Sequence, residues 1–163
     1  IDSGSKVSWA DYNDLVTQGT PLAFVAGVPK YLTNDTLGPN TNIDFLDGAP
    51  NVWDAVSNAF DFTELALGDM IDLRLDITIT TTAANQDVKA VLEMAIGSGT
   101  PYEITLAQRQ IKAAGTYSYT TYTGVYIGND ITKDNQAKIK ITTDAALTVK
   151  VNGWYCKITR NTY

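Results

Sequence analysis

The strongest constraint on the fold is a run of alternating apolar and polar residues between positions 70 and 80. The sequence MIDLRLDITIT places apolar side chains at the odd positions, which are Ile71, Leu73, Leu75, Ile77 and Ile79. The even positions between them hold Asp, Arg or Thr. Because side chains of an extended strand point alternately to its two faces, the run predicts a strand with one buried and one solvated face.

A second alternating run, VKAVLEMAI at 88–96, follows after the linker TAANQD. A short polar linker between two such runs is typical of a hairpin, so we predict that the runs pair as adjacent antiparallel strands. The side chains expected to be buried are Ile71, Leu73, Leu75, Ile77, Val88, Leu92 and Met94. Shorter strand candidates, separated by turn signals, follow at 102–106, 116–121, 124–127, 138–143 and 147–151.

The last candidate strand contains a change of parity. Its apolar residues lie at odd positions up to Val151 and at even positions from Trp154 onward. Asn152-Gly153 between them is either a hairpin turn or a bulge within one long strand, and the bulge keeps both apolar sets on one core face. Many short strands with little helix predict an all-β, antiparallel β-sandwich, here expected at 59–163.

Residues 1–58 are richer in Pro and turn-forming residues and are expected to form an irregular N-terminal arm. One short helix is expected within it. Ser8 is a candidate N-cap, Trp9 and Tyr12 share a helical face with the apolar pair that follows, and Gly19 ends the helix. The remainder of the arm is expected to be extended chain and loops packed over the sandwich.

Composition excludes several functions. The chain has no His and one Cys, so a Ser-His-Asp triad, an intrachain disulfide and a Cys-rich zinc site are all excluded. A net charge of −6 with scattered Lys and Arg argues against nucleic acid as a partner, and no apolar stretch is long enough for membrane insertion. We therefore expect no enzyme activity, no cofactor and no required metal.

Two weaker chemical alternatives remain. Asp72 and Asp76 share one face of the first strand and, with Glu93 nearby, are the candidates for a carboxylate-based glycosidase, although such residues are usually a solvated strand face. The oxygen-rich loops around Asn129, Asp130 and Asp134, and around Asn34, Asp35, Asn40 and Asn42, are candidates for structural calcium, although Asn and Asp in turns usually bind the backbone. Cys156 is expected to be a buried, inert side chain.

Tyrosines are concentrated between positions 102 and 126. Tyr combines an apolar ring with a polar tip, which suits protein interfaces and sugar stacking. The candidate receptor or subunit contact consists of Tyr102, Tyr119, Tyr122 and Tyr126, with Asn129 and Asp130 as polar neighbours. The competing expectation is that several of these rings pack inside the domain.

An ordered series of short motifs carries a resemblance to a known family. The series is VWD, FDF, LGDM, ANQDV, YIGN, AKIK and VNGWYC, preceded by SWADYNDL and LTNDTLGPNTN. In this order it resembles the C-terminal head domains of tailed-bacteriophage fibre proteins, over nearly the whole chain. The resemblance implies a jelly-roll-like sandwich, assembled as a homotrimer on the virion surface after synthesis in the host cytoplasm. The family has no catalytic residues, so the resemblance assigns none to this chain.

The resemblance also implies a function and its partners. A fibre head binds a host-surface receptor, either glycan or protein, and joins other virion proteins through residues upstream of Ile1. Residues 1–58 are expected to contribute to the contacts between subunits. The alternatives are a capsid decoration or head-fibre module without a receptor role, and a carbohydrate-binding module.

Overall fold

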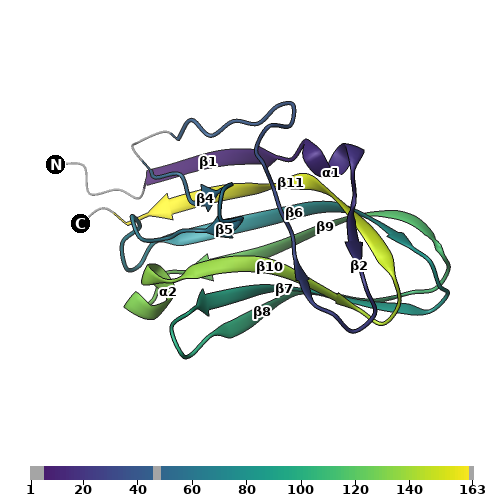
Figure 1. Ribbon diagram of the computed structural model, residues 1–163. Coiled ribbons are helices and arrows are strands. Elements are labelled where there is room, and N and C mark those ends of the chain that lie inside the picture. Colours follow the sequence, from purple (N-terminus) through teal and green to yellow (C-terminus); the bar gives the residue numbers. More distant parts are fainter. Residues whose placement is uncertain (1–5, 46–48, 162–163) are drawn as a thin grey trace.

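The computed structural model describes residues 6–45 and 49–161, whose strands form two antiparallel sheets packed face to face (Figure 1). The first, here the β6 sheet, has the order β1-β11-β6-β9, with the short β2 also pairing with β11. Its strands are β1 (Lys6–Asn13), β2 (Leu22–Phe24), β6 (Met70–Thr81), β9 (Gly115–Tyr126) and β11 (Leu147–Arg160).

The second, here the β7 sheet, has the order β4-β5-β10-β7-β8, with β3 pairing with β10. Its strands are β3 (Lys30–Tyr31), β4 (Trp53–Asp54), β5 (Ala59–Phe60), β7 (Gln86–Ile96), β8 (Tyr102–Ile111) and β10 (Gln136–Thr143). Two short helices accompany the sheets, α1 (Val16–Gly19) and α2 (Asp130–Asp134).

The strand pairs are nested along the chain. The first strand pairs with the last, β1 with β11, then β5 with β10, β6 with β9, and β7 with β8 at the centre. Successive pairs alternate between the two sheets, which is the arrangement of a jelly roll. The predicted all-β, jelly-roll-like sandwich is therefore confirmed.

The prediction that runs 70–80 and 88–96 are adjacent strands is wrong. β6 lies between β11 and β9, while β7 lies between β10 and β8 in the other sheet. The linker after β6 therefore connects the sheets instead of closing a hairpin. The alternation of side chains reports which face of a strand is buried, but not which strand lies beside it. All seven side chains predicted to be buried are at most 6% exposed.

The bulge at Gly153 is confirmed. β11 is one continuous strand, and its pairing with β6 shifts by one residue between Val151 and Gly153. Trp154, like Val151, is therefore buried. Gly153 also lies directly opposite Asn13 of β1, and a Cβ at this position would stand 2.4 Å from Asn13 Oδ1. The close approach of β1 requires glycine at this position.

The predicted helix beginning at Ser8 is wrong. Residues from Lys6 to Asn13 form β1, which pairs with β11 along its whole length. Ala10 and Tyr12 face the core while Trp9 is exposed, and this period of two decides in favour of a strand. The helix that does form, α1, starts only at Val16. The division into an arm of 1–58 and a head of 59–163 stays a prediction, although β1 is an integral strand of the β6 sheet.

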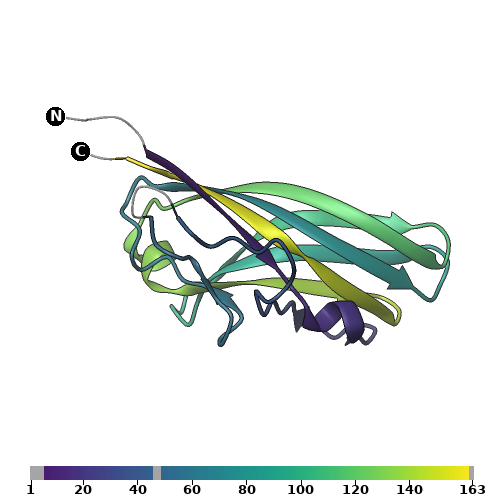
Figure 2. The ribbon, with the colours of Figure 1, turned by 90° about the horizontal axis from the view of Figure 1, so that it is seen from above.

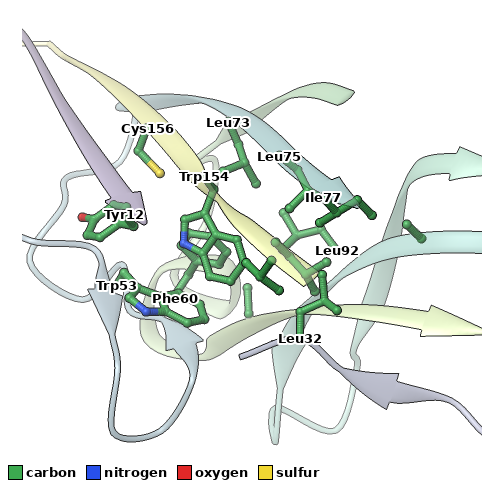
Figure 3. Packing of buried hydrophobic residues seen from close by; sticks show 14 of the residues in the cluster. Tyr12, Leu32, Trp53, Phe60, Leu73, Leu75, Ile77, Leu92, Trp154 and Cys156 are labelled. Atoms are coloured by element: carbon green, nitrogen blue, oxygen red, sulfur yellow. The ribbon is translucent and has the colours of Figure 1, made fainter. Parts of the chain in front are cut away.

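The core contains an aromatic cluster in which Tyr12, Trp53, Phe60 and Trp154 lie close together (Figure 3). The rings of Trp53 and Trp154 meet edge to face with centroids 4.5 Å apart, and Phe60 lies 4.9 Å from Trp53. Tyr12 is buried beside them and donates its hydroxyl hydrogen bond to Asn51 Oδ1 at 2.8 Å. These side chains come from β1 and β11 of the β6 sheet and from β4 and β5 of the β7 sheet. The cluster therefore packs the two sheets against each other.

Candidate functional site

The outer face of the β6 sheet carries aromatic and charged side chains in one cross-strand row. Tyr122 of β9 pairs with Arg74 of β6, and Arg74 pairs with Tyr155 of β11. These residues lie outward because their inward neighbours, such as Leu73 and Leu75, fill the core. Tyr122 is 74% exposed. Regular strands, not loops, therefore position the row.

The next row leaves a hollow beside Tyr122. Here Gly124 of β9 pairs with Asp72, and Asp72 pairs with Lys157. Gly124 has no side chain, and even a Cβ there would come no closer than 4.0 Å to Asp72 Oδ1. The result is an open hollow of about 540 Å³ lined by Asp72, Leu73, Arg74, Tyr122, Thr123, Gly124, Tyr155 and Lys157.

Hydrogen bonds and ion pairs orient the charged groups of this hollow. Arg74 Nε donates to Asp76 Oδ2 at 2.9 Å, and the hydroxyl of Thr120 donates to Asp76 Oδ1 at 2.7 Å. The Arg74 guanidinium also lies 5.4 Å from the centre of the Tyr155 ring. Asp76 and Tyr155 therefore hold Arg74 from two sides.

The second ion pair is looser. Lys157 Nζ lies 3.6 Å from Asp72 Oδ2, and both side chains are about half exposed. Each positive group of the hollow thus has a carboxylate beside it, so the hollow offers both donors and acceptors with little net charge. Exposed pairs of this kind contribute little to stability, on the order of 0–1 kcal/mol.

An apolar rim borders the hollow on the side of the first residues of β1. Trp9 pairs with Lys157 and is 42% exposed. One row further, Met70 pairs with Tyr126, and both are exposed on the same face. The outer face therefore combines an exposed ring, paired charges and an apolar margin within a few strand positions.

The structure separates the predicted tyrosines. Tyr122 and Tyr126 share the outer face of β9, whereas Tyr119 is half-buried between the sheets, with the Arg109 guanidinium 5.5 Å from its ring centre. Tyr102 belongs to β8 in the other sheet, where its hydroxyl hydrogen bonds with that of Thr132 at 2.8 Å. The candidates therefore do not form one cluster.

Asn129 and Asp130 lie at the start of α2. The Asn129 side chain accepts a hydrogen bond from the Thr132 amide at 2.8 Å and so caps the helix. In the earlier loop, the Asn34 side chain is buried, donates to Tyr12 O and accepts from the Thr36 amide. Both loops use their Asn side chains for backbone hydrogen bonds.

Within 6–45 and 49–161, no three acidic, His or Cys side chains lie close enough together to hold a metal ion.

The carboxylates considered for glycoside hydrolysis are also separated. Asp72 and Asp76 lie on the outer face of β6, each beside a cation. Glu93 belongs to β7 in the opposite sheet, where it accepts a hydrogen bond from the Tyr31 hydroxyl at 2.7 Å and pairs with Lys140 at 3.2 Å. Cys156 is fully buried, as predicted, and burial raises the pKa of its thiol, with Asp11 raising it further.

Sequence reasoning missed Arg74, Gly124, Tyr155, Lys157 and Trp9. The alternation in β6 already assigned Arg74 to the solvated face, and the bulge assigns Tyr155 and Lys157 to the same face of β11. What brings these residues together is the pairing of β6 with β9 and β11, and no local sequence pattern indicates which strands lie side by side. Among the described residues, no helix has the length and apolar character needed to cross a bilayer.

Comparison with known proteins gives a shared fold. No known protein family matches the sequence, and no curated protein does. In the crystal structure of the infectious bursal disease virus T13 particle, a chain aligns with 96% of this chain and 31% of its own length, with TM-score 0.52 and 10% identity. In T=1 particles derived from that virus, a chain aligns with 97% of this chain and 36% of its own length, with TM-score 0.50 and 8% identity.

This chain spans about a third of the length of those particle chains. At such identities the similarity shows the fold alone, a jelly-roll sandwich. The xylan-binding domain CBM22-1 of Paenibacillus barcinonensis Xyn10C also aligns, over 100% of this chain and 99% of its own, with TM-score 0.41 and 11% identity.

Proposed function

We propose that this chain is a virion-surface attachment head that binds a saccharide on the host cell through the hollow on the β6 sheet. The observation that carries the proposal is the 74% exposed ring of Tyr122 beside two ion pairs, Arg74 with Asp76 and Lys157 with Asp72. The resemblance to fibre heads supports a place on a phage fibre, and the jelly-roll fold is the one that this resemblance implies. The homotrimer and the virion-surface location belong to the same proposal.

The chemistry of the hollow favours a sugar over a peptide. An exposed Tyr ring offers a flat apolar face against which the C–H groups of a pyranose can stack. Beside it, the Asp72 carboxylate accepts and the Arg74 and Lys157 groups donate, which matches the alternating hydroxyls of a sugar. Three of the residues that line the hollow are charged, Asp72, Arg74 and Lys157, beside the rings of Tyr122 and Tyr155.

The charge of the hollow favours a neutral saccharide. Each cation already faces a carboxylate, at 2.9 Å for Arg74 and Asp76 and at 3.6 Å for Lys157 and Asp72. An acidic sugar would meet Asp72 directly and would approach a chain of net charge −6. Long-range repulsion of this kind slows association and weakens binding at low salt.

The proposal is tested by binding of purified protein to a panel of bacterial cells. Tyr122→Ala is expected to reduce cell binding about tenfold or more with unchanged melting temperature, because only an exposed ring is removed. Tyr102→Ala is the matched control, since Tyr102 is also an exposed tyrosine but lies on the other sheet. Equal binding by wild type and Tyr122→Ala would contradict the proposal and favour a decoration module without a receptor role.

A further inference from the structure

The hollow on the β6 sheet is longer across the strands than along them. All the residues that line it belong to three neighbouring strands, β9, β6 and β11. On each strand the outward side of the hollow extends over a single two-residue step, such as that from Tyr122 to Gly124 on β9. Figure 2 shows this sheet with β9, in green, on one side and β1, in purple, on the other. A ligand that fills the hollow therefore lies across the strands and reaches towards β1.

Trp9 continues this direction on the next strand. It lies on β1 and pairs with Lys157, at the opposite end of the hollow from Tyr122, and both aromatic residues are exposed. Three strand steps and one two-residue step along the strands separate Trp9 from Tyr122. With ~4.8 Å between strands and ~3.3 Å per residue, these steps place the two residues roughly 16 Å apart. Two exposed aromatic residues thus mark the ends of one path, with the ion pairs between them.

The outer face of β9 offers a second path, from Tyr122 towards Tyr126. Tyr126 is also exposed and lies two residues beyond Gly124. Its ring, however, lies over Gly128, where a Cβ would stand 3.1 Å from two of its ring carbons. The ring therefore leans away from Gly124, which is the last residue of β9 that lines the hollow. The hollow leads from Tyr122 towards Trp9 and not along β9.

We propose that the hollow binds an extended, linear oligosaccharide of about four sugars, which crosses the strands from Tyr122 to Trp9. This inference rests on the proposed saccharide site and adds the length and the direction of its ligand. One pyranose with its glycosidic oxygen lengthens a chain by about the spacing of two neighbouring strands, so roughly 16 Å corresponds to about three such steps and four rings.

The two ends and the middle of the path have different chemistry. The first and last sugars stack on the rings of Tyr122 and Trp9. The sugars between them meet Arg74, Asp72 and Lys157, whose donors and acceptors suit hydroxyl groups. A single sugar would contact only one end of this open surface and would leave the other ring unused. Several contacts in series therefore supply the affinity that one shallow contact does not.

Oligosaccharides of defined size test this length. The probe is the neutral surface polysaccharide of a bacterial strain that the wild type binds, cut by partial acid hydrolysis and separated into fractions of about one to eight sugars. Calorimetry is expected to show an affinity that rises about tenfold or more between two and four sugars and then stays constant. The plateau is expected because a longer chain extends beyond both rings.

Variants at the far ends of the two paths separate them. Trp9→Thr removes the ring but keeps a residue that favours strands. It is expected to bind the disaccharide as the wild type does and to lose the gain at four sugars, whereas Trp9→Tyr keeps a ring and most of the gain. Tyr126→Ala is the matched comparison and is expected to keep the full gain, because its ring lies over Gly128. Melting temperature and mass in solution are measured for each variant.

The outcomes distinguish this inference from the proposed function. Equal affinity at every length, or a gain that Tyr126→Ala removes and Trp9→Thr keeps, would overturn the inference and leave the saccharide site at Tyr122 in place. A changed mass of Trp9→Thr in solution would also overturn it, because Trp9 would then belong to a subunit contact. A wild type that binds no neutral fraction, or disaccharide binding unchanged in Tyr122→Ala, would contradict the proposed function itself and this inference with it.

Discussion

The guanidinium of Arg74 lies 5.4 Å from the centre of the Tyr155 ring while its Nε donates to Asp76 at 2.9 Å. These two contacts fix the position of the donor group before any ligand arrives. Preorganisation of this kind reduces the entropy lost on binding. The hollow beside Tyr122 is thus built on three neighbouring strands, with its Arg74 donor held by two contacts.

Replacing Arg74 by Lys tests that arrangement. Lys keeps the charge but has neither the planar group that stacks on Tyr155 nor the fixed set of donors. We expect saccharide affinity to fall about tenfold, or ~1.4 kcal/mol, with an unchanged melting temperature. Arg109→Lys is the control, because Arg109 also lies over a tyrosine ring, that of Tyr119, but outside the hollow. Equal losses in both variants would mean that the effect is not specific to the hollow.

Leu73→Ala tests the core behind the site. Leu73 is 3% exposed, so its truncation removes buried apolar surface and leaves a cavity. The expected loss in the free energy of unfolding is about 2–5 kcal/mol, measured by denaturant unfolding. Val56→Ala serves as the control, because Val56 is 93% exposed and its truncation is expected to change stability by less than ~0.5 kcal/mol.

Gly153→Ala tests the bulge and the approach of β1. A Cβ at this position would stand 2.4 Å from Asn13 Oδ1 and 2.5 Å from Tyr12 O, so β1 would have to move. We expect a destabilisation of about 1–3 kcal/mol. Gly19→Ala is the control, since a Cβ there meets nothing within 4 Å. A neutral Gly153→Ala would contradict the assigned pairing of β1 with β11.

The Asp35 carboxyl makes the stability of the folded protein depend on pH. Burial raises the pKa of its carboxyl, but amides of Leu37, Leu15 and Val16 donate to it and bring the pKa below its ordinary value. The ionised form is therefore favoured in the folded state. The contribution of the Asp35 carboxylate to the free energy of unfolding is fully present above its pKa in the unfolded chain, about 3.9. This contribution is lost as the pH falls through the lower pKa of Asp35 in the folded protein.

Asp35→Asn is expected to lower the melting temperature at pH 7 and to make its fall between about pH 5 and pH 2 shallower than in the wild type. Asp130→Asn is the charge control, because Asp130 is an exposed residue at the start of α2. The same acid profile in wild type and Asp35→Asn would show that the hydrogen bonds to Asp35 do not stabilise the fold.

Much of the fold follows from local pattern. The alternation from Ile71 to Ile79 defines the buried face of β6, and the change of parity at Gly153 defines the bulge in β11. Both are consequences of side chains pointing alternately to opposite faces of a strand. The same reasoning applied to β9 assigns Val125 inward and Tyr122 and Tyr126 outward, although the sequence predicts two shorter strands, 116–121 and 124–127, where the structure has one.

The rest depends on contacts that the local pattern does not contain. The spacing of three between Trp9 and Tyr12 would place both rings on one face of a helix, whereas pairing with β11 makes this segment a strand and places the two rings on opposite faces. The hollow exists only because β6 lies between β9 and β11, which brings Gly124, Asp72 and Lys157 into one row. Nested pairing of distant strands could not be read from either alternating run alone.

The most direct test of the account is a titration of isotope-labelled protein with neutral saccharides, followed by amide chemical shifts. The account predicts that the shifts move in a cluster at Arg74, Tyr122, Gly124 and Lys157, and that the cluster is absent in Tyr122→Ala. Shifts confined to β8 and α2, around Tyr102 and Asn129, or binding only to acidic saccharides, would contradict it.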